Sequence, residues 1–205
     1  MEQVNARAVA AVEVGGMTRA SLLLKGTLAA AAAYGTAVAG PFVSRALAQS
    51  GDVEILNFAL TLEYLEADFY RRAQQLGLSG EALTYARQFG DAESAHVDAL
   101  TRTIRQLGGR PARKPRFQFP MRDQASFLEL AQALEEVGVG AYNGAAPSIR
   151  SREVLTAAGG IVQVEARHAA AIRALRDQNP TPNGAFDKTL TKQQALDQAK
   201  PFIRS

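Results

Sequence analysis

One pattern of residues occurs twice in this chain of 205 residues and limits what it can fold into. The pattern is Glu-x6-Tyr-x22-Glu-x2-His, and its two copies are offset by 72 residues. The first copy consists of Glu63, Tyr70, Glu93 and His96. The second copy consists of Glu135, Tyr142, Glu165 and His168. The chain has only two histidines, so both belong to the repeat. Two copies predict a pseudo-twofold fold whose halves bring equivalent groups to one central site.

The segments that carry the repeat have the periodicity of long amphipathic helices. Four such helices are predicted, separated by glycine- and proline-containing breaks, over residues 52–76, 81–107, 123–146 and 152–178. Asp123 is a candidate N-cap of the third helix, and Thr191 with Gln194 predicts a capping box for a short helix in the tail. No segment has a convincing strand pattern.

The lengths of the connections predict the topology. The first and second helices are joined by a short linker, as are the third and fourth, so each pair should be an antiparallel hairpin. The linker 109–122 is long enough to run the length of a bundle. We therefore expect an all-α, antiparallel four-helix bundle of ferritin-like connectivity, with two hairpins joined by a long crossover. The expected domains are a leader over residues 1–48, the bundle over 49–178, and a C-terminal tail with a short helix over 179–205.

The apolar stripes place acidic residues inside this bundle. Both Glu-x-x-His pairs fall within core-facing stripes, and each predicted helix points at least one glutamate inward. The stripe of the fourth helix runs through Leu155, Ala158, Val162, Glu165, His168, Ile172 and Leu175. Glu66 lies on the face of Glu63 and is interpreted as a rim acid, with a place beside the site as the alternative. Glu136 lies one residue off its stripe and is expected to be solvated.

Four carboxylates inside a bundle repel one another, and each costs several kcal/mol to desolvate. Protonation would neutralise them, but two divalent cations match four carboxylates in charge, and two neutral imidazoles complete the ligand set. Carboxylate and imidazole ligands suit iron or manganese, with zinc as a further candidate. The predicted bridging ligands are Glu93 and Glu165, the predicted terminal ones Glu63, Glu135, His96 and His168. The alternative is a metal-free bundle that keeps these residues as a hydrogen-bonded core network.

The N-terminal segment has the order of an export signal. Arg19 and Lys25 precede a weakly hydrophobic stretch over residues 26–43, and Ala-Leu-Ala at 46–48 predicts cleavage after Ala48. The protein is therefore expected to be periplasmic or extracellular. The signal resembles the twin-arginine type, except that Ala20 stands where the second arginine belongs. A retained membrane anchor is the alternative, although Pro41 would interrupt its helix.

Composition excludes several classes of function. The absence of cysteine excludes disulfides, thiolate zinc sites, iron–sulfur clusters and cysteine nucleophiles. The net charge is only +3, and cations concentrate in the proline-containing linker at 108–116. We therefore expect no nucleic-acid binding.

Four stretches carry a resemblance to known families. "LNFALTLEYLEADFY" at 56–70 resembles the first helix of bacterioferritins and of exported bacterial ferritin-like domain proteins, some of them desiccation-related. "AESAH", "ALEEVGVGAY" and "VEARH" resemble the other three helices, so the resemblance spans 52–178 and the tail ending "KPFI". It implies the same six metal ligands and places Tyr70 and Tyr142 near the metals. These tyrosines are either ordinary core aromatics or partners of the site through a hydrogen bond or a redox role. Ala92 and Val164 depart from the pattern, because bacterioferritins have an acid there that orients an imidazole.

The resemblance implies a function in metal chemistry. The expectation is a di-iron carboxylate protein, with manganese as the alternative metal, that oxidises Fe(II) or scavenges peroxide in stress protection. Its expected partners are metal ions and dioxygen or peroxide. The helix faces leave a homo-oligomer, such as a dimer, open. Two alternatives stay open: a non-catalytic, metal-stabilised structural protein of the envelope, and a manganese-catalase-like enzyme. A rubrerythrin-type electron chain is excluded, because its rubredoxin part needs cysteines.

Overall fold

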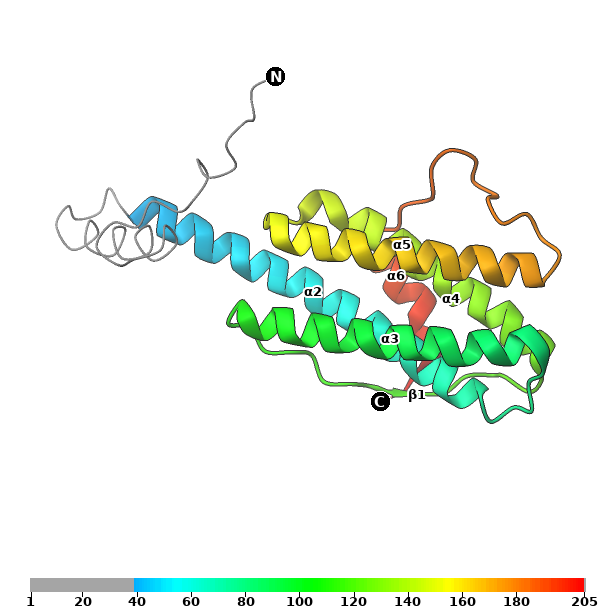
Figure 1. The fold of residues 1–205 in the computed structure, drawn as a ribbon. Helices are drawn as coiled ribbons and strands as arrows, with labels where there is room; N and C mark the ends of the chain where they lie inside the picture. The colour runs from blue at the N-terminus through cyan, green and yellow to red at the C-terminus, as the bar shows by residue number, and fades with distance from the viewer. Residues whose placement is uncertain (1–38, 205) are drawn as a thin grey trace, which may run out of the picture. The chain divides into compact units, whose positions relative to one another are not determined.

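Four long helices make up most of the chain in the computed structural model, which describes residues 39–204 (Figure 1). They are α2 (Ala39–Ala73), α3 (Gly80–Gln106), α4 (Gln124–Ala145) and α5 (Arg152–Leu175). From Ala48 onward the chain forms one unit. The predicted leader, residues 1–48, lies mostly outside the described residues. No helix among residues 39–204 is both long and apolar enough to span a membrane.

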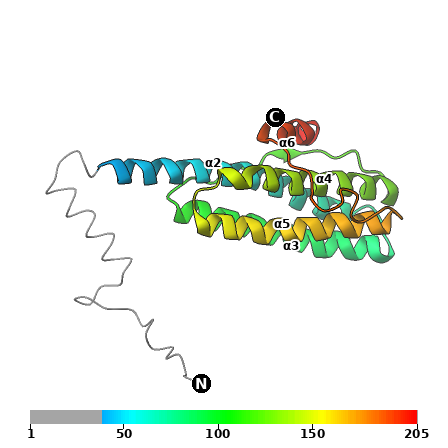
Figure 2. The ribbon, with the colours of Figure 1, turned by 90° about the horizontal axis from the view of Figure 1, so that it is seen from above.

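The helices form two antiparallel hairpins, α2–α3 and α4–α5, joined by a long crossover (Figures 1 and 2). The crossover runs beside the bundle from the end of α3 back to the start of α4 (Figure 1). The prediction of an all-α helical bundle is therefore confirmed.

Local sequence signals account for the helix ends. Asp123 caps α4, where its side chain accepts a hydrogen bond from the backbone N–H of Ser126 at 2.8 Å, as predicted. Ser151 caps α5 in the same way through the N–H of Val154. Helix α3 ends at Gln106, and Gly108 follows its C-cap with a φ of 75°, in the left-handed region that favours glycine.

The C-terminal segment folds back onto the bundle. It contains α6 (Lys192–Ala199), opened by the predicted Thr191–Gln194 capping box, and the 3₁₀ turn η3 (Lys200–Phe202). Strand β2 (Ile203–Arg204) then pairs antiparallel with β1 (Arg116–Phe117) in the crossover. No strand was expected, because two-residue strands are too short to show an alternating pattern.

The C-terminal segment packs against α4 at Gly140 and Gly144. The backbone N–H of Leu190 donates to the carbonyl of Gly140 at 2.8 Å. A Cβ on Gly144 would lie 1.9 Å from the carbonyl oxygen of Leu190. Small residues at these two positions therefore allow the tail to approach the α4 backbone.

Several predicted boundaries were wrong. Helix α2 begins at Ala39 rather than near residue 52. Gly51 does not break it, and Pro41 falls in the first turn, where its missing N–H has no intrahelical partner to lose. On α5, Leu155 is 42% exposed rather than core-facing, and its neighbour Val154 is buried instead. The third helix ends before Pro147 as predicted, and η2 (Ala146–Ser148) follows it.

Two apolar clusters fill the bundle. We call the first the aromatic cluster; its members include Phe69, Tyr70, Phe89 and Phe127. We call the second the aliphatic cluster; its members include Leu60, Leu100, Ile104, Val154 and Ile161. On α3, Glu93 and His96 lie between Phe89 of one cluster and Leu100 of the other. The polar groups of the repeat therefore have apolar packing on both sides along the bundle.

Candidate metal centre

The structure brings the six predicted metal ligands together in the bundle core. The four glutamates come from four different helices and are fully buried, at 0% exposure: Glu63, Glu93, Glu135 and Glu165. The histidines are also buried, with exposures of 9% for His96 and 6% for His168. Buried charges at this density need compensation from inside the protein.

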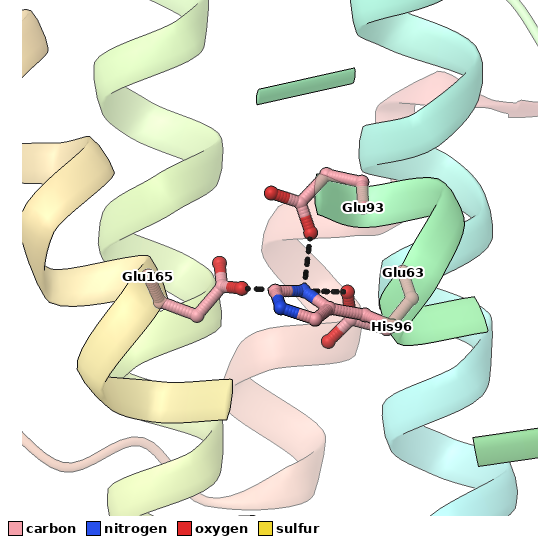
Figure 3. A group of neighbouring side chains, drawn as sticks. All are labelled: Glu63, Glu93, His96 and Glu165. Carbon is pink, nitrogen blue, oxygen red and sulfur yellow. Dashed lines mark hydrogen bonds and ion pairs between the residues drawn. The ribbon is translucent and has the colours of Figure 1, made fainter. Parts of the chain in front are cut away.

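The first group of ligands surrounds His96 (Figure 3). Its Nδ1 lies 2.8 Å from Glu93 Oε2, and 3.2 Å from oxygens of both Glu63 and Glu165. A ring nitrogen carries at most one proton, so it cannot donate properly to three carboxylates at once. Three oxygens and one nitrogen that face a common point are the arrangement in which a cation binds.

The second group surrounds His168. Its Nδ1 lies 3.0 Å from Glu93 Oε1 and 3.4 Å from Glu135 Oε2, and Glu165 completes the group. Within each group, one ligand atom per residue lies within 4.8 Å of the others. Glu93 and Glu165 belong to both groups, whereas each histidine belongs to one. This sharing is the arrangement expected of two bridging carboxylates and two terminal imidazoles.

Several polar atoms of the core make no hydrogen bond of good geometry, although some of them lie at ion-pair distance from an imidazole. Within the described residues, these atoms include Glu93 Oε1, Glu135 Oε2, both oxygens of Glu165 and His168 Nδ1. Each buried group left unpaired costs about 1–3 kcal/mol, and more when it is charged. Three of these atoms belong to the shared carboxylates Glu93 and Glu165, and all come from residues of the two ligand groups, so cations at the two groups would satisfy them. The donor set therefore fits a pair of metal ions.

The ionisation of the core is strongly perturbed. Burial and neighbouring carboxylates raise the pKa of Glu63 and of Glu165 well above the usual range. Burial opposes charging of His96, but its contacts with Glu165, Glu63 and Glu93 outweigh burial and raise its pKa to about 12. Without metal, protons on the imidazoles therefore balance part of the carboxylate charge, and a metal must displace those protons on binding.

The second imidazole and its glutamates follow the same rule. Burial opposes charging of His168, but Glu135 and Glu93 outweigh it and raise the pKa of His168 to about 10. Burial acts to raise the pKa of Glu93 as well, but its close contacts with the imidazoles of His168 and His96 lower that pKa to about 2. Glu93, shared by both groups, is thus the carboxylate most strongly stabilised in its charged form.

The two tyrosines of the repeat are hydrogen-bonded across it. The hydroxyl of Tyr70 donates to Glu135 Oε1, and the hydroxyl of Tyr142 donates to Glu63 Oε1. Each copy of the pattern therefore supplies the tyrosine that orients the glutamate of the other copy. Burial raises the pKa of both tyrosines well above the usual range, which keeps the hydroxyls protonated as donors.

Phe89 is a site residue that the sequence reasoning missed. Its ring stacks on the imidazole of His168, with centroids 3.8 Å apart and planes inclined by 18°. Ala92 and Val164 cannot orient an imidazole as an acid would, and for His168 this aromatic contact restricts the ring instead. Phe89 lies seven residues before His96 on α3, so its place on the core stripe was the only available signal.

The interpretation of Glu66 as a rim acid was wrong. Glu66 is only 2% exposed and lies among the buried carboxylates. Glu66 lies three residues after Glu63 on α2, so the two side chains project to the same side of the helix. Glu136 pairs with Arg173, and its side chain is 41% exposed, which agrees with a solvated face.

Comparisons with known proteins give the family. The sequence profile of the ferritin-like domain matches residues 51–178, the segment that contains the whole repeat. No curated protein matches the chain.

Solved structures share the fold. A conserved hypothetical protein of Mycobacterium tuberculosis superposes with a TM-score of 0.57 at 17% identity, covering 62% of this chain and 97% of that one. A ferritin-like, diiron-carboxylate protein of Bacillus anthracis superposes with a TM-score of 0.56 at 21% identity, covering 62% of this chain and 96% of that one. The four helices, their long crossover and the matched segment together show that the chain belongs to the ferritin-like domain family.

Proposed function

We propose that this protein binds two metal ions, iron or else manganese, and uses them to oxidise Fe(II) or to consume peroxide. One observation carries the proposal: two groups of buried ligand atoms overlap in Glu93 and Glu165. Glu63 and His96 would complete one metal position, and Glu135 and His168 the other. The description of the Bacillus anthracis structure as a diiron-carboxylate protein supports iron as the metal.

Bound iron would supply reversible one-electron oxidation and Lewis acidity, which the protein's own side chains do not offer. The chain's contribution is to hold six ligands in place. Tyr70 and Tyr142 each hold one oxygen of a terminal glutamate, which leaves the other oxygen facing the imidazoles. The aromatic and aliphatic clusters exclude water at both ends and strengthen electrostatic interactions between ligand and cation.

We further propose that the protein acts outside the cytoplasm in protection against oxidative stress, as the export-like leader favours. Two other functions compete with this one. A non-catalytic envelope protein would use the metals only for stability, because a ligand that binds the native state alone stabilises it. A manganese-catalase-like enzyme would use the same ligands with a different metal.

Metal analysis followed by two activity assays separates these functions. Purified protein is reconstituted anaerobically with Fe(II) or Mn(II), desalted, and examined by elemental analysis and circular dichroism. We expect two metals per chain, Fe(II) oxidation in air and loss of hydrogen peroxide. Less than one metal per fully folded chain would overturn the site. Metal bound without turnover would favour the structural function, and peroxide loss with manganese alone would favour the catalase-like one.

The double variant Glu93→Gln/Glu165→Gln is the matched test, because it removes the charge of both shared carboxylates while keeping their size. Glu129→Gln on the exposed face of α4 is its control. The double variant should lose both metals, and the control should keep them.

A further inference from the structure

A fifth buried carboxylate lies beside the six predicted ligands. Glu66 is 2% exposed, and its Oε2 has no hydrogen-bond partner among the described residues. The charges that act on it most strongly are those of Glu165 and then Glu63, both members of the ligand groups. An unpaired carboxylate oxygen in this setting is costly unless a cation or a proton satisfies it.

The repeat explains why there is only one such residue. The position 72 residues after Glu66 is Gly138 on α4. A Cβ on Gly138 would lie 2.9 Å from Glu165 Oε2 and 3.1 Å from Glu66 Oε1. The two carboxylates therefore converge on the space that Gly138 leaves open. A glutamate in both copies would put two side chains into that space.

We propose that Glu66 is a seventh protein ligand of the di-metal centre, and that it enters beside Glu165 through the space left by Gly138. The inference rests on the proposed metal binding and adds to it that the two metal positions are inequivalent. Its chemical consequence follows from charge. Four carboxylates balance two divalent ions, whereas five balance one divalent and one trivalent ion. Glu66 therefore favours a metal pair that carries one additional positive charge.

The repeat residues alone would make a centre with two equal halves. Glu66 adds a carboxylate on α2, and Gly138, at the equivalent position of α4, leaves the space for it. A second unequal position beside the site is Phe89, whose counterpart 72 residues later is Ile161; among the described residues, the aromatic contact with an imidazole is therefore made to His168 and not to His96. Both differences fall beside the ligand groups, which supports inequivalence of the metals rather than of the scaffold.

Glu66→Gln tests the proposal, because the amide keeps the size of the side chain and removes its charge. Co(II) is titrated into metal-free wild type, Glu66→Gln and the control Glu129→Gln, with the visible absorption of bound cobalt as the readout of coordination. Tb(III) is then titrated as a trivalent probe. We expect Glu66→Gln to weaken one Co(II) dissociation constant by about 10- to 100-fold, to change the cobalt spectrum, and to weaken Tb(III) binding by a larger factor.

The outcomes separate this inference from the proposed function. Wild type and Glu129→Gln should each bind two Co(II) ions. If Glu66→Gln then shows the same cobalt spectrum and the same dissociation constants, the role of Glu66 is overturned and the proposed metal site stands. Wild type that binds no Co(II) would overturn both. If Glu66→Gln does not fold, Glu66→Asp is used instead, because it keeps the charge but moves the carboxylate away from the metals by the length of one methylene. An unchanged spectrum in that variant overturns the proposal, and a changed one supports it.

Discussion

Removing one hydroxyl from the core tests whether the crossed tyrosine–glutamate contacts stabilise this fold. Tyr142 is 6% exposed, and its hydroxyl donates to Glu63 Oε1, while Glu63 itself is 0% exposed. Tyr142→Phe keeps the ring in place but leaves that oxygen without a donor. Leaving a buried oxygen without its donor costs about 1–3 kcal/mol. For a domain of this size each kcal/mol lowers the melting temperature by about 2–4 °C, so we expect a decrease of about 2–12 °C.

The measurement is thermal unfolding of metal-free protein, followed by circular dichroism at a fixed pH. Tyr85→Phe is the control, because within the described residues the hydroxyl of Tyr85 has no hydrogen-bond partner. Its ring stacks on Phe89, and the substitution keeps that ring. Tyr70→Phe should match Tyr142→Phe, since Tyr70 makes the equivalent contact with Glu135. If Tyr142→Phe were no less stable than Tyr85→Phe, the stabilising role of these contacts would be refuted.

Three further predictions concern the ligands, the tail and the surface. His168→Ala should lower metal occupancy and thermal stability together, as measured by elemental analysis and melting; wild type that melts at one temperature with and without chelator would contradict this coupling. Gly144→Ala should release the tail, because its Cβ would lie 1.9 Å from Leu190 O, and limited proteolysis should then cut near residue 190. Gly159→Ala is its control, since a Cβ there meets nothing within 4 Å, and it should stabilise the helix by about 0.5–1 kcal/mol. Burial acts to raise the pKa of Asp68, but hydrogen bonds from three basic side chains outweigh it, and the pKa lies below its ordinary 3.8. Its stabilising contribution is therefore present above pH 3.8 and is lost as the pH falls through the lower folded value. In Asp68→Asn, the urea concentration at the midpoint of unfolding should therefore change less between pH 6 and pH 2 than in wild type.

The core of the site could be predicted because its geometry is local. Residues three or seven apart on a helix share a face, so Glu93 with His96, or Glu63 with Tyr70, must project to the same side once the helix forms. The repeat then required both halves to face one centre. The capping residues Asp123 and Thr191 were predictable for the same reason, since each acts on a backbone group three residues away.

Contacts between helices could not be predicted, because they depend on how each helix is rotated about its axis. A rotation of about one residue, 100°, exposes Leu155 and buries Val154. The same uncertainty hid the burial of Glu66 and the stacking of Phe89 on His168. The extra turns of α2 before residue 52 were missed because a lone glycine weakens a helix without ending it.

Repeated and unrepeated residues have different roles in the proposed centre. The eight repeated residues supply the ligands and the hydroxyls that hold them. Glu66 and Gly138 occupy equivalent positions with opposite properties, one a buried acid and the other an open space. Substitutions at Glu66 or Gly138 should change the dissociation constants of the first and second metal ion by different factors. Comparing paired variants at repeated and unrepeated positions therefore measures the asymmetry of the centre, and we expect the inequality in metal binding to depend on Glu66 and Phe89.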